Sequence, residues 1–192
     1  MDLAAIRRMT SRMWGPMCAV TAAHGDEAGG QIAVGVLSGS ILPEHPRLLI
    51  QIWKANRTHD LIAASRAFAV HPLGADQADL VRQLGFRSGH DAVDKLAGLA
   101  WSRGVTGSPI LAAPPGFVEC RVVGTLDATD MTVFLGDVVA GEWRGGETPM
   151  VQAYEMIGAM PPEWQEEYRR HDQAQREAAA RLLGGIGDGS PA

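Results

Sequence analysis

Residues 17–40 read MCAVTAAHGDEAGGQIAVGVLSGS, and this stretch decides the fold that the sequence predicts. The run of Cys, Ala, Val and Thr at residues 17–23 is typical of a β-strand, as is the apolar segment at residues 31–38. Between them, His24, Gly25 and Asp26 begin a turn that continues to Gly30. The stretch therefore predicts an antiparallel hairpin whose loop is rich in glycine.

Strand-like segments dominate the rest of the chain as well. The expected strands cover residues 48–53, 67–73, 116–126, 131–143 and 148–154, and the expected short helices cover residues 2–13, 58–64 (capped by Thr58), 75–84 and 91–96. These segments do not alternate as βαβ units, and the dense glycine run follows the last helix rather than the first strand, which disfavours a Rossmann fold. The sequence predicts an α+β domain, mainly antiparallel β, in the form of a barrel with peripheral helices.

A long C-terminal helix is expected to begin at Pro161-Pro162 and to run to about residue 183. One stripe of this helix holds Trp164, Tyr168, His171, Gln175, Ala178 and Leu182. Few of these are large aliphatic residues, so the stripe is expected to pack on a partner or on the barrel rim, with a plain surface helix as the alternative. The chain thus divides into an N-terminal helix (residues 1–16), a barrel domain (residues 17–158) and a C-terminal helical extension (residues 159–192), whose tail is expected to be disordered.

Composition argues against several classes of function. The chain has 192 residues, of which 46% are hydrophobic, and a net charge of −5 with scattered basic residues. This fits one domain with a full core, and it argues against nucleic acid or an anionic membrane as the main partner. No apolar run approaches the roughly 18–20 residues that a membrane helix needs, and no secretory signal is visible.

The cysteines and histidines bear on compartment and metal binding. Cys18 and Cys120 each lie in a strand-like apolar stretch, so both are expected to be buried thiols in a reducing cytoplasm rather than a disulfide. The six histidines are dispersed along the chain, and no zinc-type spacing of ligands occurs. The sequence therefore predicts a cytoplasmic protein without a metal site.

A candidate phosphate site lies where the strand at residues 48–53 meets the next helix. Lys54 and Arg57 bring positive charge to this junction, and Thr58 brings a hydroxyl group. The free backbone N–H groups of a first helical turn add donors and a favourable dipole. Alternatively, Thr58 only caps the helix and the two cations are solvated.

A second candidate site is the segment at residues 30–40. Ala33, Gly35 and Gly39 would let the backbone approach a flat ligand closely, and Ser38 and Ser40 offer hydroxyl groups. The alternative is a tightly packed barrel strand whose glycines mark bulges. The residues by themselves leave both interpretations open.

The order of these segments resembles the flavin reductase-like domain family. A Ser-x-Ser motif at residues 38–40 is followed by a proline-led strand and by a helix that begins at Arg57-Thr58. Residues 68–73 (FAVHPL) are similar to the family's Phe-Ala-Val-Asn-x-Leu strand, and Asp76-Gln77 are similar to the Asp-Gln of its next helix. Further similar motifs, in the same order, are residues 107–111 (GSPIL), 119–120 (EC) and 135–138 (LGDV). The resemblance covers roughly residues 17–154.

This resemblance implies an FMN-binding split β-barrel, usually a homodimer with the flavin near the subunit interface. It also implies hydride transfer from NADH or NADPH to the flavin, and often a partner monooxygenase. Such a protein orients the rings and excludes water, so it needs no side-chain acid or base. An FMN-dependent oxidoreductase is the favoured function. The alternatives are an FMN-binding protein without efficient NAD(P)H reductase activity, such as an electron carrier, and a module for a non-flavin ligand.

The resemblance also implies a set of site residues. The flavin-facing strand would comprise Ile32, Ala33, Val34, Gly35, Val36 and Leu37, with Ser38 and Ser40 at the family's Ser-x-Ser, and the phosphate side would comprise Lys54, Asn56, Arg57 and Thr58. Where the family often shows Thr-x-Ser-Ser, this chain has Ile32, Val34 and Gly35. Where the family often shows Gly-Asp-His on the pyridine-nucleotide side, this chain has Thr129-Asp130-Met131, which leaves Asp130 as the nicotinamide-side candidate.

Overall fold

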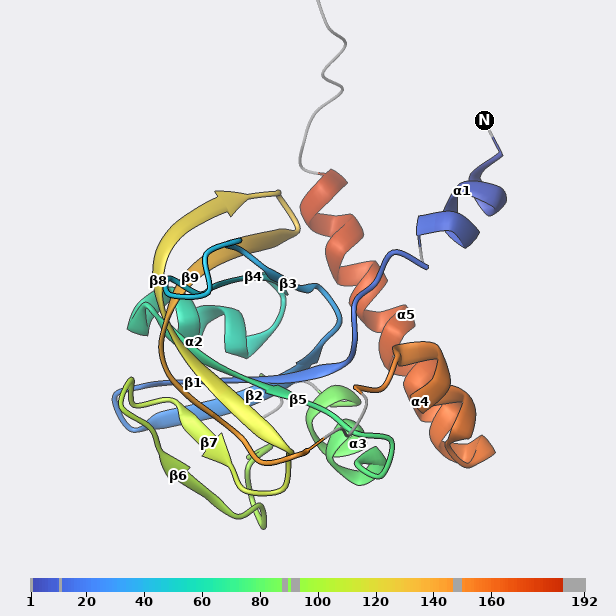
Figure 1. Ribbon diagram of the computed structural model, residues 1–192. Helices are drawn as coiled ribbons and strands as arrows, with labels where there is room; N and C mark the ends of the chain where they lie inside the picture. Colours follow the sequence, from blue (N-terminus) through green and yellow to red (C-terminus); the bar gives the residue numbers. More distant parts are fainter. Residues whose placement is uncertain (1, 11, 88–89, 91–93, 147–149, 185–192) are drawn as a thin grey trace, which may run out of the picture.

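The structure is a computed structural model that describes the chain except for residues 1, 11, 88–89, 91–93, 147–149 and 185–192 (Figure 1). Its strands are β1 (Cys18–His24), β2 (Glu27–Ala33), β3 (Val36–Ser38), β4 (Arg47–Trp53), β5 (Ala67–Pro72), β6 (Trp101–Arg103), β7 (Pro109–Leu111), β8 (Gly116–Asp127) and β9 (Met131–Trp143). Its helices are α1 (Leu3–Thr10), α2 (Arg57–Ser65), α3 (Ala78–Gly85), α4 (Ala153–Ala159) and α5 (Pro162–Gly184).

Seven of the strands form one curled sheet in the order β2-β1-β5-β8-β9-β4-β3 (Figure 1). All neighbouring pairs in this sheet are antiparallel. The two edge strands, β2 and β3, are consecutive in the chain and are separated only by Val34 and Gly35. The backbone therefore joins one edge of the sheet to the other, which curls it into a barrel. The expected fold class, α+β and mainly antiparallel β, is confirmed.

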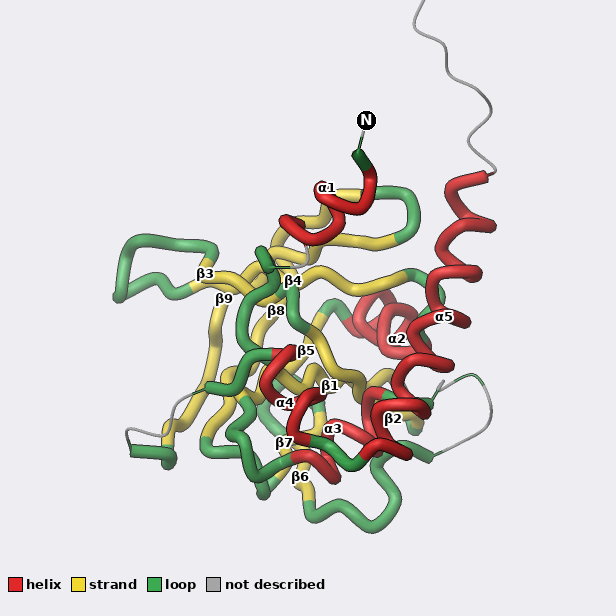
Figure 2. The backbone as a smooth tube through the Cα atoms, turned by 90° about the vertical axis from the view of Figure 1, so that its right-hand side faces the viewer, coloured by secondary structure: helices red, strands yellow, loops and turns green. Residues whose placement is uncertain are grey.

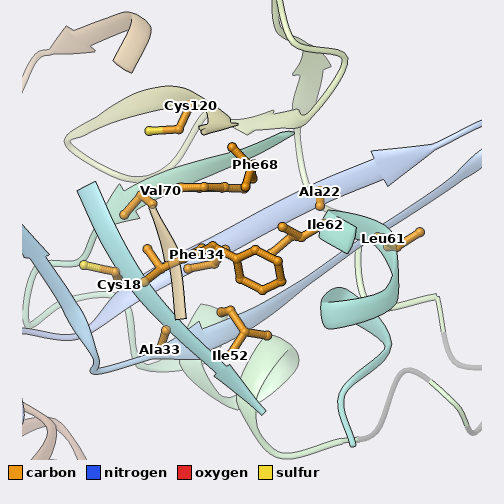
Figure 3. Packing of buried hydrophobic residues seen from close by; sticks show 13 residues of the cluster. Cys18, Ala22, Ala33, Ile52, Leu61, Ile62, Phe68, Val70, Cys120 and Phe134 are labelled. Atoms are coloured by element: carbon orange, nitrogen blue, oxygen red, sulfur yellow. The ribbon is translucent and has the colours of Figure 1, made fainter. Parts of the chain in front are cut away.

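The barrel interior is filled by alternate residues of its strands (Figure 3). In β1, Cys18 and Val20 point into this core, whereas Ala19 packs into a second cluster outside the barrel. The rings of Phe68 and Phe134 are fully buried inside. This period of two is what strands with an apolar layer on both faces require.

The expected strand at residues 31–38 is two strands, so its sequence-based boundaries are wrong. β2 already begins at Glu27, because Gly25 and Asp26 alone make the turn of the first hairpin. Gly25 has φ +60°, a conformation that glycine adopts without steric cost.

The break between β2 and β3 is where the barrel closes. The carbonyl oxygen of Val34 accepts a 2.8 Å hydrogen bond from the N–H of Gly15, and that of Gly35 accepts a 2.8 Å bond from the N–H of Gln51. The chain therefore leaves β1 and pairs with β4 beyond this point. A strand that changes partner in this way cannot keep one continuous ladder.

Helices α3, α4 and α5 lie together on one side of the barrel (Figures 1 and 2). They enclose a second hydrophobic cluster that includes Ala19 of β1, Leu84 of α3 and Met156 of α4. Helix α2 instead contributes Leu61 and Ile62 to the barrel interior. The wall of the barrel near α5 is therefore covered by helices, and this is where the candidate site lies.

Several helix boundaries also differ from the sequence-based expectation. Helix α2 begins at Arg57 and its N-cap residue is Asn56, so the expected Thr58 cap is wrong; Thr58 is buried in the first turn. Helix α3 begins at Ala78 rather than residue 75, because the side chain of Gln77 accepts a 3.0 Å hydrogen bond from the N–H of Gly74 and holds the preceding residues in a turn.

The segments flanking the second hairpin contain further differences. Residues 150–154 do not form the expected last strand: Gln152 makes one isolated bridge to Pro16, and α4 follows. Residues 95–98 are turns rather than helix, and residues 91–93 of the helix expected at residues 91–96 lie outside the described residues. The β6–β7 ribbon was not predicted. The expected disordered tail lies outside the described residues too.

The cysteines are both buried free thiols, and burial raises the pKa of each to about 12. In the described part of the chain, His, Cys, Asp and Glu side chains nowhere gather in a group of three that could hold a metal ion. Within the same residues, none of the helices has the length and apolar character needed to cross a membrane.

Candidate functional site

A cavity of about 280 Å³ lies between the β2–β3 junction and the helices α3, α4 and α5. This volume lies just below the range of about 300–1,000 Å³ that small-ligand pockets occupy. Its barrel side is formed by Trp14, Met17, Gln31, Ile32, Ala33, Val34, Gly35, Gln51, Trp53 and Asn56. Its helical side is formed by Val81, Leu84, Gly85, Phe86, Lys95, Ala153, Ile157, Tyr168, His171, Asp172, Gln175 and Arg176.

Residues 32–35 form an apolar strip on the barrel side of the cavity. Ile32, Ala33 and Val34 line it in sequence, and Gly35 follows at the break between the strands. A Cβ atom at Gly35 would lie 2.8 Å from the side-chain oxygen of Gln51, so glycine is needed for this close approach. The glycine therefore lets the side chain of Gln51 pack against the backbone at this break.

Two buried glutamines give the cavity unpaired polar groups. Gln31 of β2 is 6% exposed and Gln175 of α5 is 9% exposed. Among the described residues, neither side-chain oxygen has a hydrogen-bond partner. Because an unpaired buried amide costs about 1–3 kcal/mol, both groups suit a ligand that offers N–H or O–H donors.

The helical side of the cavity is held in place by packing of α5 on α3. Nε of Arg82 lies 2.8 Å from Oε2 of Glu167, and its guanidinium lies 4.6 Å from the centre of the Trp164 ring. The ring centres of Phe86 and Tyr168 are 5.5 Å apart, and burial raises the pKa of Tyr168. The N-terminal part of the stripe predicted for the C-terminal helix, with Trp164 and Tyr168, thus packs against the outside of the barrel domain, whereas Leu182 at its far end is exposed.

The charged groups on the α5 wall are paired with each other. Nε of Arg176 donates a 2.7 Å hydrogen bond to Oδ2 of Asp172, one helical turn away. This bond raises the pKa of Arg176, so the guanidinium stays charged. The pair contributes no net charge to this side of the cavity.

The cavity gathers some of the residues that the sequence suggested. Ile32, Ala33, Val34, Gly35 and Asn56 all line it. Beyond the break, β3 continues away from the cavity: Val36 packs against the barrel interior and Leu37 is exposed.

The two serines of the Ser-x-Ser motif shape the loop after β3 and do not line the cavity. Oγ of Ser38 donates a 3.0 Å hydrogen bond to the carbonyl oxygen of Ser40, and Oγ of Ser40 accepts a 3.1 Å bond from the N–H of Leu42. Their hydroxyl groups are thus engaged in local turns.

The residues suggested for a phosphate lie around the N-terminus of α2. Asn56 is the N-cap residue of α2 and has an extended backbone, but its side chain makes no hydrogen bond to the helix N–H groups. Asn56 also lines the cavity. Nζ of Lys54 lies 2.6 Å from Asp127, and the side chain of Arg57 pairs with Glu27 and, at 3.4 Å, with Asp60. Both cations therefore neutralise carboxylates.

Asp130 lies in the turn between β8 and β9 and does not line the cavity. Its carbonyl oxygen accepts a 2.9 Å hydrogen bond from the N–H of Lys54, which ties this turn to the end of β4. The nearby carboxylate of Asp127 accepts a hydrogen bond from Lys54, and this bond lowers its pKa.

A larger, more open hollow of about 670 Å³ lies beside the β6–β7 ribbon. Its buried acid, Glu119, already accepts hydrogen bonds from the N–H groups of Val105 (3.0 Å) and Thr106 (2.8 Å) and from the Thr106 hydroxyl (2.7 Å). This carboxylate is therefore engaged in holding the loop at residues 105–106. We therefore take the smaller cavity beside α5, with its unpaired amides, as the candidate site.

Gln31 lies within the candidate segment at residues 30–40 but was not singled out, and Gln51, Trp53 and the contribution of α5 to this cavity were not predicted. Gln31 carried a usable signal, because it is a polar residue within an otherwise apolar strand. Gln175 also carried one, since it stands in the middle of the stripe that packs on the domain. That both residues reach one cavity is a result of the tertiary structure.

Comparison with known proteins gives a consistent set of matches. The sequence profile of the flavin reductase like domain matches residues 10–158. A high molecular weight rubredoxin of Moorella thermoacetica is 32% identical over 157 residues, which are 80% of this chain and 65% of that protein. An NADH-dependent FAD reductase of Streptomyces globisporus is 31% identical over 130 residues, which are 67% of this chain and 70% of that protein. The chain therefore spans slightly less than two thirds of the first of these relatives.

Solved structures agree with these sequence matches. The NADH:FAD oxidoreductase SgcE6 of Streptomyces globisporus, in complex with NAD and FAD fragments, has a TM-score of 0.66 and 28% identity, and the match covers 78% of this chain and 86% of that one. An FMN-binding protein of Thermus thermophilus with bound p-hydroxybenzaldehyde has a TM-score of 0.63 and 28% identity, and the match covers 69% of this chain and 73% of that one.

Proposed function

The chain belongs to the flavin reductase-like domain family, and on this premise we propose that it is an FMN-dependent oxidoreductase that transfers hydride from NADH or NADPH to flavin. Relatives named as NADH-dependent reductases of FAD and FMN support this reaction. A relative named as the reductase subunit of a flavin-dependent monooxygenase supports a partner oxygenase that uses the reduced flavin.

The observation that carries this proposal is the cavity at the β2–β3 junction. Ile32, Ala33, Val34 and Gly35 offer an apolar strip of backbone, and the same cavity is lined by Gln31, whose amide oxygen is unpaired among the described residues. An isoalloxazine ring has a large apolar face and one edge with an N–H group between two carbonyl groups. The cavity lining fits both features, with Gln31 as the acceptor for the ring N–H.

The protein's part in the reaction is to bind, orient and shield. A bound flavin supplies the hydride acceptor. The strip at residues 32–35 fixes the plane of the ring, and the α5 wall excludes water from the face opposite to it. No side chain that lines the cavity has to act as an acid or base for the hydride itself.

The phosphate group of FMN is assigned to the N-terminus of α2. Lys54, Asn56, Arg57 and Thr58 are the proposed contacts, with Ser38 and Ser40 on the adjoining loop. The exposed pairs of Lys54 and Arg57 with carboxylates are easily exchanged, because surface ion pairs contribute only about 0–1 kcal/mol. A phosphate could therefore replace Glu27 or Asp127 as their partner.

We further propose a homodimer in the cytoplasm. Leu37, Leu126, Val139 and Trp143 on β3, β8 and β9 are exposed, and exposed apolar side chains of this size favour a subunit interface. The two free, buried thiols suit a reducing compartment.

One observation favours a second candidate function, an FMN-binding protein without efficient nicotinamide-dependent turnover. Asp130, the residue suggested for the nicotinamide side, does not line the cavity, and Met131 stands where the family often has histidine. Such a protein would bind FMN equally well but would take electrons from another source.

The test begins with the absorbance spectrum of the purified protein loaded with FMN, before and after anaerobic NADH or NADPH. Bleaching of the flavin bands by either nucleotide is the expected result. Bands that persist with both nucleotides would favour the second function, and failure to retain FMN would overturn both. A Gln31→Met variant should raise the FMN dissociation constant about tenfold, the loss expected for one buried hydrogen bond to a ring N–H.

A further inference from the structure

Helix α5 lies beyond the part of the chain that matches the family. The match ends at residue 158, whereas α5 spans Pro162–Gly184. The helix nevertheless supplies Tyr168, His171, Asp172, Gln175 and Arg176 to the lining of the candidate site. An element outside the shared domain therefore forms one wall of the cavity.

The buried position of this helix is occupied by an unusual residue. Gln175 is the buried residue of α5 within its described length, and the other positions are half-buried or exposed. A helix that only covers a domain would bury aliphatic side chains at such a position. Gln175 lines the cavity, and its buried amide oxygen has no hydrogen-bond partner among the described residues. A buried, unpaired amide oxygen of this kind favours a ligand that donates a hydrogen bond to it.

The chemistry of the amide limits what that ligand can be. A glutamine side chain presents a carbonyl oxygen beside an NH₂ group, and its complement is another carboxamide-like edge, with an N–H donor beside an acceptor. Recognition by charge is disfavoured, because Asp172 and Arg176 on the same wall neutralise each other at 2.7 Å. The α5 wall is therefore better suited to bind neutral hydrogen-bonding groups than phosphates.

We propose that Gln175 binds the carboxamide of the nicotinamide ring, so that α5 is the element that positions the electron donor over the flavin. This inference rests on the proposed function. The part of the chain that matches the family already contains residues 32–35 and Gln31, which are assigned to the flavin. The α5 wall lies outside that part, so we assign it to the nicotinamide ring. Tyr168 and Phe86, whose rings lie 5.5 Å apart in the same lining, give this second ring an aromatic border.

Binding of NAD⁺ to the full-length, FMN-loaded protein tests this role without turnover, because the oxidised nucleotide cannot donate hydride. The variant Gln175→Met keeps the length of the side chain and removes the amide. Gln173→Met is the matched control, since Gln173 lies on the exposed side of the same helix and bonds to Glu177 at 2.8 Å. Calorimetric titration gives the dissociation constants.

The expected result is a dissociation constant for NAD⁺ raised about tenfold or more in Gln175→Met and changed less than about twofold in Gln173→Met. ADP-ribose, which lacks the nicotinamide, should bind wild type and Gln175→Met equally. Equal weakening of ADP-ribose would put Gln175 on the adenosine side and overturn the assignment. Weaker FMN binding by Gln175→Met would also overturn it.

The same titrations keep this inference separate from the proposed function. An unchanged NAD⁺ constant in Gln175→Met, with normal FMN binding, would remove the role of Gln175 and leave the flavin assignment intact. Melting temperatures of the two variants within a few degrees of wild type would show that both fold normally. A changed NAD⁺ constant in a normally folded variant then supports direct contact.

Discussion

The backbone N–H of Leu111 donates a 3.1 Å hydrogen bond to Nε2 of His71, whose side chain is completely buried. Nδ1 therefore carries the ring proton, and it lies 3.4 Å from the carbonyl oxygen of Ala19. A proton on Nε2 would place two N–H groups against each other. His71 is thus a neutral bridge that joins β1, β5 and β7.

Stability is expected to fall in mild acid because of this bridge. Burial lowers the pKa of His71 from 6.5 to about 4. Between these values the unfolded chain binds a proton that the folded protein does not, so the free energy of unfolding is highest above pH 6.5 and decreases as the pH falls towards 4. The full loss is about 3 kcal/mol.

Urea denaturation at neutral pH and at about pH 4.5, within the range set by the two pKa values, measures this effect. His71→Asn is the control, because asparagine can accept and donate hydrogen bonds but does not titrate. The acid-induced loss should be smaller in this variant by about 2–3 kcal/mol. An equal loss in both proteins would contradict the role of His71.

Gly104→Ala is expected to destabilise the protein. A Cβ atom at Gly104 would overlap the carboxylate of Glu119, which is held by three hydrogen bonds from Val105 and Thr106. Displacing that buried carboxylate should cost about 1.5–3 kcal/mol, the usual contribution of hydrogen bonds to a charged group. Gly158→Ala in α4 is the control, since nothing lies within 4 Å of its Cβ position and alanine favours a helix by about 0.8–1.0 kcal/mol. Thermal melts should move in opposite directions.

Tyr168→Ala is expected to loosen α5 from α3. Tyr168 is half-buried and packs on Phe86, with the ring centres 5.5 Å apart, so truncation should lower the free energy of unfolding by about 1–3 kcal/mol. The chain's other tyrosine, Tyr154, is 75% exposed, and Tyr154→Ala should change stability by less than about 0.5 kcal/mol. If both variants melt alike, α5 does not depend on this contact.

Arg57→Ala is expected to weaken FMN binding. A charged hydrogen bond to phosphate contributes about 1.5–3 kcal/mol, which corresponds to a dissociation constant raised about 10–150-fold. Fluorescence titration of FMN measures the change. Arg169→Ala removes an exposed arginine that pairs with Glu166 at 3.0 Å, and it should leave the constant unchanged. An unchanged constant in Arg57→Ala would remove Arg57 from the phosphate site.

The sequence predicted much of the fold because the signals involved are local. The long segments that became β8 and β9 alternate in polarity and are separated by a short polar turn, and their bounds were expected to within one residue. The first hairpin was predicted for the same reason, although the predicted turn was longer than the two residues, Gly25 and Asp26, that form it. The start of α5 followed from Pro161-Pro162, since proline suits the first turn of a helix.

The candidate site was only partly predictable. The segment at residues 32–35 was singled out from its small residues and from the resemblance to a family, and it does line a cavity. Ser38 lies outside that lining, because β3 pairs with β4 and carries the chain away from the cavity. Lys54 follows the end of β4 and also lies outside it, paired with Asp127. Whether these residues reach a ligand stays a prediction.

What the sequence by itself determined is the set of strands, their antiparallel character and the family, since side-chain alternation, turn residues and motif order are properties of neighbouring positions. Only the tertiary structure decided that the strand breaks at Val34 and Gly35, because that break is caused by hydrogen bonds to Gly15 and Gln51. Only the tertiary structure brought Gln31 and Gln175 to one cavity. Contacts between such distant positions depend on how the closed barrel and α5 pack, and no local pattern encodes them.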